Sequence, residues 1–336
     1  MSESLVVGLD IGGTSTRALV ATTTGTVLGR GRAGGGNPTT HGADAAAGEL
    51  RLALTAALAP VDPGRVSAAA MGLAGAGRLL ADPVARAAFD RVWDQVGLRC
   101  GYDVTGDALA AYASGTPHPD GSIVIAGTGA IAGEIRDLTL HRVADGHGWL
   151  LGDAGSGFWL GREAVRRTLA AIETGQPRSG LPDLVMTELL GDPATGGGPR
   201  AGPARRTVDA LVQAVTARPP IALAALAPLV VRAARADDPV AADVIATAAR
   251  LLAGSVGRIR GDGDRGPIVL GGGLLTGDTP LSAALGDALR ERWPAAPLVT
   301  AGDGAAGAAW LAARTLPDVT DPAALHHRLL GAGVLP

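Results

Sequence analysis

An aspartate followed by two glycines and a threonine, close to the start of the chain, has residue types that can hold phosphate oxygens. The apolar run 5–9 leads into Asp10-Ile-Gly12-Gly13-Thr14, and a second run, 17–22, follows at once. This order predicts a β-hairpin whose tight turn exposes backbone N–H groups, which an anion can approach closely at glycine. Asp10 could hold a hydrated Mg²⁺ against such an anion. An ordinary glycine hairpin stays open as the alternative, since short motifs are weak.

A second glycine turn repeats this arrangement later in the chain. Residues 122–126 are apolar, Gly127-Thr128-Gly129 follows, and 131–135 is apolar again. Two more glycine-centred turns occur at 152–157 and 271–273. Several such turns, in two halves of similar make-up, predict two lobes that close on a polyphosphate.

The segments that must position these turns alternate between strand-like and helix-like patterns. In the first half, three strands are predicted up to residue 32, followed by helix 44–58, strand 66–73, helix 83–96, a short strand ending near residue 107 and helix 108–113. This order belongs to a mixed sheet flanked by helices, and therefore to the α/β class. Residues 117–121 are predicted to cross over to the second half, where the pattern restarts.

The second half is richer in helix. Helices are predicted over 158–173, 181–190, 205–216, 221–236, 239–260, 281–292, 304–314 and 321–330. Short strands are predicted at 267–270 and 298–300, and the stretch 142–157 is polar and glycine-rich. Residues 196–203 are predicted to be mobile, and the arrangement of 179–204 is left open.

Composition narrows the class of protein. A chain of 336 residues has room for two domains, and its 47% hydrophobic and 18% charged content excludes a largely disordered chain. The net charge is −3 without a basic block, which argues against nucleic acid or an anionic membrane surface as partner. All basic residues other than histidine are Arg, so mechanisms that need a lysine nucleophile or a P-loop lysine are excluded.

Cysteine and targeting signals are also informative. Cys100 is the single cysteine, so an internal disulfide, a zinc–cysteine cluster or an iron–sulfur cluster within one chain is excluded. No signal peptide is recognised at the N-terminus, and no run approaches the roughly 20 apolar residues of a membrane span. We therefore expect a cytoplasmic protein.

Taken together, the glycine turns carry a family resemblance. The sequence resembles the sugar kinase, actin and seventy-kilodalton chaperone superfamily: Asp10-Ile-Gly-Gly-Thr14 matches its first phosphate motif, Ala126-Gly-Thr-Gly129 its second, and Leu270-Gly-Gly-Gly273 its adenosine motif. Within it, the chain is most similar to the N-acetylglucosamine kinase group, which has a BadF/BadG/BcrA/BcrD-type ATPase domain. The resemblance spans nearly the whole chain, including 152–157 and an element that ends at Asp107.

The resemblance implies roles for individual residues. Asp107 falls where the family keeps its general base, which would take a proton from a sugar hydroxyl; capping the helix at Ala108 is the alternative, and it could do both. Family positions that hold the sugar are Asn37, Asp107, Gly146, His147, Gly148 and Asp153. Asn37 could instead form a turn, His147 could be a loop histidine without ligand, and Asp153 could cap a helix.

ATP-binding residues follow from the same resemblance. They are Gly12, Gly13, Thr14, Thr128, Gly129, Ala130, Ala224, Gly272 and Gly273, with Asp10 as the metal anchor through water. Small residues would let the adenine base lie flat, although Ala224 could simply be a helix-packing residue.

Two departures from the family pattern bear on the substrate. Ala154 stands where the group commonly has Glu, which could alter metal positioning or substrate choice, and the family often has Trp at His147.

Rival functions of the same fold are less favoured. An activator ATPase needs two cysteines per subunit for its iron–sulfur cluster, and this sequence has one. Repressor/ORF/kinase proteins carry a cysteine-rich zinc motif, which is missing here, and no helix-turn-helix of a repressor is recognised before Leu5. A chaperone-like protein needs a peptide-binding domain, while a non-catalytic sugar sensor remains open.

The sequence therefore predicts two actin-like (ribonuclease H-like) lobes with a cleft between them. Residues 1–117 form the first lobe, with 316–336 packed back on it, and 118–315 form the second. The expected activity is ATP- and Mg²⁺-dependent phosphorylation of an amino sugar, N-acetylglucosamine or glucosamine, at a hydroxyl such as O6. Whether the amine is acetylated is left open, and a homodimer is expected because it is usual in this group.

Overall fold

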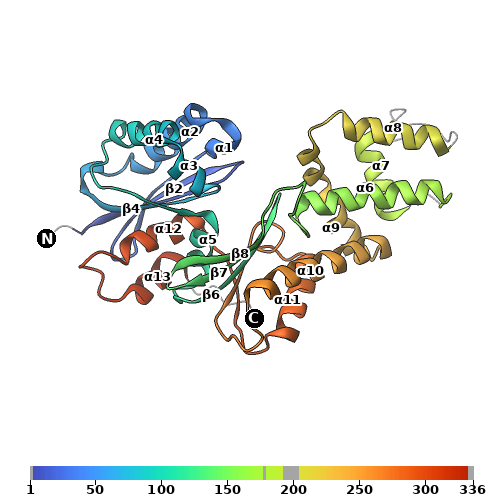
Figure 1. The fold of residues 1–336 in the computed structure, drawn as a ribbon. Coiled ribbons are helices and arrows are strands. Elements are labelled where there is room, and N and C mark those ends of the chain that lie inside the picture. Colours follow the sequence, from blue (N-terminus) through green and yellow to red (C-terminus); the bar gives the residue numbers. More distant parts are fainter. Residues whose placement is uncertain (1–2, 177–178, 192–203, 332–336) are drawn as a thin grey trace.

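Two five-stranded sheets carry the fold (Figure 1). The structure is a computed structural model, and it describes residues 3–176, 179–191 and 204–331. The first sheet has the order β3-β2-β1-β4-β5. Its strands are β1 (Leu5–Ile11), β2 (Thr16–Thr22), β3 (Val27–Ala33), β4 (Val66–Leu73) and β5 (Asp103–Gly106).

The second sheet repeats the first. Its strands are β6 (Gly121–Ala126), β7 (Ala130–Arg136), β8 (Thr139–Asp145), β9 (Ile268–Gly271) and β10 (Leu298–Thr300), in the order β8-β7-β6-β9-β10. In both sheets the first three strands in sequence pair antiparallel and the other two join in parallel. The first two predicted glycine turns, at residues 12–14 and 127–129, each join the first two strands of a sheet. The predicted mixed-sheet fold of two similar halves is therefore confirmed.

Helices flank both sheets, and several begin at an Asp, Ser, Thr or Asn side chain that accepts a backbone N–H. In the first part they are α1 (Pro38–His41), α2 (Ala43–Leu58), α3 (Ala76–Ala81), α4 (Pro83–Gln95) and α5 (Asp107–Gly115), with a 3₁₀ turn at Pro63–Arg65. In the second they are α6 (Gly157–Glu173), α7 (Gly180–Leu190), α8 (Ala204–Thr216), the 3₁₀ helix Pro220–Leu226, α9 (Ala227–Arg235), α10 (Pro239–Ile259), α11 (Pro280–Arg292), α12 (Gly304–Ala313) and α13 (Pro322–Leu330). Figure 1 shows α6 to α9 on the side of the second sheet that faces away from the first.

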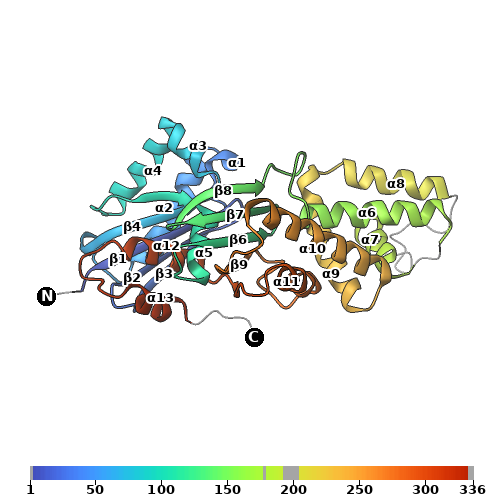
Figure 2. The same ribbon diagram turned by 60° about the horizontal axis from the view of Figure 1, so that its bottom comes forward.

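The first sheet is covered by helices from both ends of the chain. In Figure 2, α2 and α4 lie on one side of it and α12 and α13 on the other. A Cβ atom on Gly8 of β1 would stand 2.0 Å from the carbonyl oxygen of Ala305, so only glycine lets α12 approach this closely. The His326 Nε2 of α13 donates to the Ala113 carbonyl at 2.8 Å. Helix α12, which the predicted division assigns to the second lobe, therefore packs on the first sheet.

Several predicted elements differ from the structure. Strand β8 was not predicted, because it is an edge strand whose side chains are mostly exposed and which therefore shows little apolar alternation. The helix predicted over 221–236 is divided into a 3₁₀ helix and α9, with prolines at 219, 220 and 228 around the break. Helix α3 was not predicted, and 196–203 lies outside the described residues.

Helix α10 contradicts the prediction that no segment approaches membrane-spanning length. Its 21 residues have a mean hydropathy of 1.4, which by length and composition alone would suffice to cross a membrane, and α8 with 220–235 would qualify only as one span bent by 110°. A long core helix has the same character. Val244, Leu252 and Val256 of α10 are buried in the core of the second sheet and its helices.

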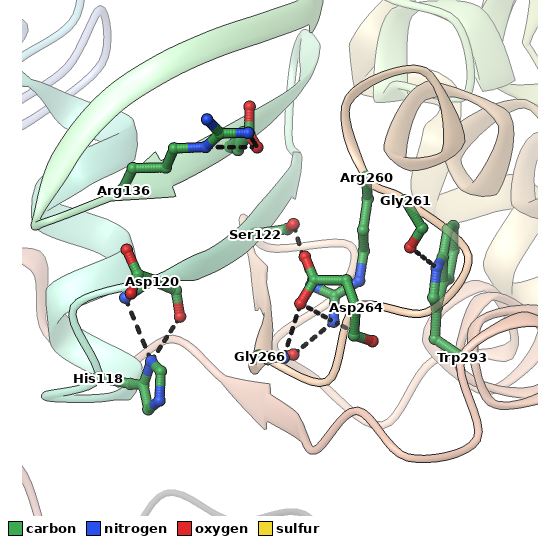
Figure 3. A network of polar contacts seen from close by, with 10 residues as sticks. His118, Asp120, Ser122, Arg136, Arg260, Gly261, Asp264, Gly266 and Trp293 are labelled. Atoms are coloured by element: carbon green, nitrogen blue, oxygen red, sulfur yellow. Dashed lines mark hydrogen bonds and ion pairs between the residues drawn. The ribbon is translucent and has the colours of Figure 1, made fainter.

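A buried guanidinium fastens the loop between α10 and β9 to the second sheet (Figure 3). The Arg260 side chain is fully buried and donates to Ser122 Oγ and to the Asp264 carbonyl, both at 3.1 Å, and to the Gly266 carbonyl. It also pairs with the Asp264 carboxylate at 3.3 Å and lies over the Trp293 ring. Burial lowers the pKa of Arg260. These contacts hold the chain at the start of β9, whose other end carries the turn 271–273.

Candidate active site

The first glycine turn presents free hydrogen-bond donors. The Gly12 N–H donates to the Ser15 carbonyl at 2.9 Å, which closes the turn. In the part of the chain that the structure describes, the N–H groups of Gly13 and Thr14 have no acceptor, and both residues are exposed. A Cβ atom on Gly13 would meet nothing within 4 Å, so there is open space for an anion in front of these donors.

The second glycine turn has the same character. The Gly127 N–H donates to the Gly129 carbonyl at 2.9 Å, and among the described residues the N–H groups of Thr128 and Gly129 lack acceptors. The first residue of α6 abuts this turn, because the Gly157 N–H donates to the Gly127 carbonyl at 2.7 Å. The positive end of the α6 dipole is therefore close to the free donors and favours an anion there.

The glycine turn 271–273 and Ala224 lie at the same end of the second sheet. Gly272 has a φ of 82°, and a Cβ atom there would lie 2.3 Å from the Ala126 carbonyl oxygen, directly before the second turn. The Ala224 carbonyl oxygen lies 3.7 Å from the place of a Cβ on Gly157. Two of the predicted adenosine residues, Gly272 and Ala224, therefore lie close to the predicted phosphate turn.

Asp10 carries a raised pKa in a group of charges. Its carboxylate pairs with Arg17, directly opposite on β2, at 3.0 Å. Burial raises the pKa of Asp10 to about 6, and the negative charges of Asp107 and Asp303 add to this rise while Arg17 opposes it. Asp303 caps α12 and forms an ion pair with Arg30. Sequence reasoning missed Arg17 and Asp303, although the hairpin register alone would have placed Arg17 opposite Asp10.

Asp107 is the first residue of α5. The N-cap position belongs to Gly106, so the alternative that Asp107 caps this helix is wrong. One oxygen of the Asp107 carboxylate accepts the Ala108 N–H at 2.9 Å. Burial raises the pKa of Asp107, and its charge acts on Asp10, so the candidate base lies within electrostatic range of the first glycine turn.

Asn37 holds a turn in this structure. Its side-chain oxygen accepts the Thr39 N–H at 2.8 Å and caps α1, which is the alternative that the sequence left open for it. The loop it belongs to reaches the first glycine turn, because the Gly36 N–H donates to the Gly12 carbonyl at 3.2 Å and His41 Nε2 lies 2.8 Å from the Gly13 carbonyl oxygen. A role for Asn37 in sugar binding stays a prediction.

Asp153 also differs from its predicted alternative. Ser156, not Asp153, caps α6. Asp153 is buried with a φ of 57°, and its carboxylate accepts the Ala130 N–H at 3.3 Å, next to the second glycine turn. Burial raises the pKa of Asp153, the charge of Asp145 adds to this rise, and His147 opposes it.

An aspartate that the sequence analysis did not single out organises the loop that holds Gly146, His147 and Gly148. Asp145, at the end of β8, accepts the N–H groups of Gly146 at 2.8 Å, Asp153 at 2.6 Å and Ala154 at 2.9 Å. These three bonds close residues 146–152 into a loop whose three predicted sugar-binding residues are exposed. Asp and Asn side chains often stabilise loops by accepting backbone N–H groups in this way. The spacing of residues in the sequence does not show which carboxylate does so.

Comparison with known protein families identifies the family to which this chain belongs. The family model described as the BadF/BadG/BcrA/BcrD ATPase family matches residues 7–312. The chain belongs to this family. The likeness predicted from the glycine turns is therefore confirmed.

Individual relatives of this BadF/BadG/BcrA/BcrD-family chain are similar at modest identity. N-acetyl-D-glucosamine kinase from Dictyostelium discoideum is 26% identical over 199 residues, which cover 56% of this chain and 61% of that relative. A structure from Chromobacterium violaceum, whose protein bears the provisional name N-acetylglucosamine kinase, is 27% identical with a TM-score of 0.68 and covers 93% of this chain and 99% of that one. A ROK family glucokinase from Streptomyces griseus, solved with glucose and AMPPNP, has the same fold at 23% identity and a TM-score of 0.58, covering 92% and 99%.

The residues of this family member fit the triphosphate that an ATPase uses. The four free N–H groups of the two turns can donate to phosphate oxygens, and a Cβ atom on Gly273 would meet nothing within 4 Å, which leaves space beside the second turn. No side chain of the sequence could act as a P-loop lysine, so backbone donors and the α6 dipole would carry most of the phosphate contact.

The residues also fit a hydrated Mg²⁺. In the described ranges, no group of three or more His, Cys, Asp or Glu side chains could ligate a metal. Mg²⁺ usually keeps several waters and is held by one or two carboxylates together with substrate phosphates. Asp10 is suited to this outer position, since a cation there would offset the repulsion among Asp10, Asp107 and Asp303.

Proposed function

We propose that this protein is a kinase that transfers the γ-phosphoryl group of Mg·ATP to a hydroxyl, most simply O6, of an amino sugar such as N-acetylglucosamine or glucosamine. The observation that supports it most is the pair of repeated hairpin turns with free N–H donors, one of which has the Asp10 and Asp107 carboxylates nearby. Membership of an ATPase family and relatives named N-acetylglucosamine kinase favour the same conclusion.

In this proposal Asp107 acts as general base. It accepts the proton of the sugar hydroxyl while that oxygen forms a bond to the γ-phosphorus, and the bond from this phosphorus to the bridging oxygen breaks to release ADP. The free N–H groups of the turns stabilise the charge on the phosphate oxygens. Mg²⁺, held by Asp10 through water, would neutralise charge on the phosphates. Closure of the two lobes would exclude water and limit hydrolysis.

The sugar would be held by the loops that carry Asn37, Asp107, 146–148 and Asp153. Asp153 is the best supported of these, because it is buried and bound to the start of β7 beside the second turn. The chain has Ala154 next to it, whose methyl group can neither ligate a metal nor accept a sugar hydroxyl. We also propose a cytoplasmic homodimer, as is usual for this group, and light scattering at micromolar concentration would test the dimer.

Release of ADP tests the function directly. Purified protein with Mg·ATP would be assayed with glucosamine, N-acetylglucosamine, N-acetylmannosamine, glucose or no sugar. We expect turnover that depends on one amino sugar, which would also identify it. Equal release with and without sugar would contradict the kinase and indicate an ATPase, whereas binding of a sugar without turnover would indicate a sensor.

The ion pair between Arg17 and Asp10 predicts a pH effect. Because the pKa of Asp10 is about 6 and its charged form holds the metal, kcat/KM should fall as the pH decreases through that value. Arg17 lowers this pKa, so Arg17→Met should move the acid limb to higher pH, by roughly half a pH unit for a partly exposed pair.

The pH–rate profile of Arg32→Met provides the control, because Arg32 lies opposite Arg17 on β3, one strand farther from Asp10. Its acid limb should match that of the wild type. If Arg17→Met leaves the midpoint in place, Asp10 does not govern the acid limb.

A further inference from the structure

A pocket of about 620 Å³ lies between the edge strand β8 and the C-terminal end of α10. Its lining includes Arg142 and Val143 of β8, Arg258 and Ile259 of α10, and His147 and Leu151 of the loop between them. The glycine turns 12–14, 127–129 and 271–273 do not line it, whereas Gly152 and Ala154 of the turn 152–157 do, so the pocket adjoins the loop that carries the predicted sugar-binding residue His147. The volume falls within the range of pockets that bind small molecules.

The pocket lining carries a net positive charge, because it contains two arginines and one aspartate, and the charge of Arg258 has no partner among the described residues. Arg258 is exposed, its guanidinium donates to Ser255 Oγ at 2.9 Å, and it forms no ion pair with any residue that the structure describes. Arg142 shares its charge with Glu134 and donates to the Ile259 carbonyl at 2.8 Å. Asp145 also borders the pocket and adds one negative charge, and its carboxylate accepts three backbone N–H groups.

We propose that this pocket binds a small phosphorylated polyol, a phosphomonoester of the size of a sugar phosphate. Guanidinium groups match phosphate oxygens in planar, paired geometry, and the imidazole of His147 can add a further donor. Val143, Leu151 and Ile259 offer apolar walls for the carbon skeleton. A dianion of this kind would supply the negative charge that Arg258 lacks within the described chain.

Occupation of the pocket would be coupled to the candidate active site through one loop. Asp145, His147 and Ala154 border the pocket, and the Asp145 carboxylate holds the N–H of Asp153, whose own carboxylate is bonded to the start of β7. A ligand that shifts this loop would therefore move Asp153. This coupling, unlike the binding itself, rests on the proposed kinase function, and it would appear as a change of KM for the sugar.

Calorimetric titration tests the binding without requiring turnover. The probes would be inorganic phosphate and glucose 6-phosphate, with glucose as the uncharged control. Arg258→Gln should weaken the binding of both anions roughly tenfold or more, as expected for the loss of one charge-assisted contact.

Arg250→Gln is the matched control. Arg250 is exposed on the same helix and donates to Thr247 Oγ1, three residues earlier, as Arg258 does to Ser255, but it does not line the pocket. Its affinity for the anions should stay within about twofold of the wild type. Both variants keep the glycine turns, so anion binding there cancels in the comparison.

The outcomes separate the two proposals. The proposed anion site would be ruled out if the wild-type protein bound neither anion, or if Arg258→Gln bound them as the wild type does. This conclusion would hold even if the sugar panel identifies a kinase. Selective loss in Arg258→Gln would support the pocket even if no sugar is phosphorylated, and the kinase proposal alone would then fail.

Discussion

Asp107→Asn is expected to reduce phosphoryl transfer by roughly two to four powers of ten, the usual contribution of a general base. The amide has nearly the shape of the carboxylate, and its oxygen can still accept the Ala108 N–H. It cannot accept the hydroxyl proton of the sugar. Steady-state kinetics should therefore show a loss in kcat with a KM for ATP close to that of the wild type.

Stability distinguishes this loss from misfolding. The pKa of Asp107 is raised by burial, so the folded protein binds this proton more tightly than the unfolded chain does. Such a group favours the folded state at low pH, and its contribution is lost as the pH rises through the folded pKa. A neutral amide avoids that cost, so Asp107→Asn should be at least as stable as the wild type at pH 7.

Asp103→Asn offers a matched control for the same measurement. Asp103 is an exposed carboxylate at the other end of β5, and its removal should leave kcat unchanged. An Asp107→Asn variant that keeps its rate would mean that another group takes the proton.

Arg260→Met is expected to lower the free energy of unfolding by roughly 3–5 kcal/mol, as for a buried charged network that loses one partner. Methionine fills part of the volume but donates no hydrogen bond. Ser122 Oγ and the carbonyls of residues 264 and 266 would then lack their donor. Urea unfolding monitored by tryptophan fluorescence would measure the change, since Trp293 lies beside the guanidinium.

The control for this prediction is Arg292→Met. Arg292 lies over the same Trp293 ring, but its side chain is 45% exposed and pairs with Asp262 at the surface. Its removal should cost no more than about 1 kcal/mol. Equal effects of the two substitutions would show that the stacking on Trp293, rather than the buried hydrogen bonds of Arg260, carries the stabilisation.

Local patterns predicted most of the strands and helices because apolar runs and glycine turns are local features. The hairpins at Gly12 and Gly127 followed directly from such patterns, and so did the mixed sheets. Strand β8 was not predicted because apolar and polar residues alternate only weakly in this solvated edge strand. The division of 221–236 follows from the prolines at 219, 220 and 228, which interrupt an otherwise helical pattern.

Contacts between segments that are distant in sequence could not be predicted from local patterns. The small-residue composition of α12 predicted a helix but not its neighbour, and nothing near Gly8 in sequence indicates a helix from the far end of the chain. In the candidate site, the pairing of Arg17 with Asp10 followed from hairpin register and could have been predicted. The clamp by Asp145 depends on a loop conformation with positive φ at 145, 146, 148 and 153, which the sequence does not specify.

The position of α12 also has a consequence for the order in which the protein is made. A ribosome releases all five strands of the first sheet before it begins the second, yet the helix that covers the Gly8 face of that sheet emerges only after both sheets are complete. During synthesis that apolar face therefore stays exposed to water or to a chaperone. The sheet that is synthesised first can complete its packing only after α12 has been synthesised.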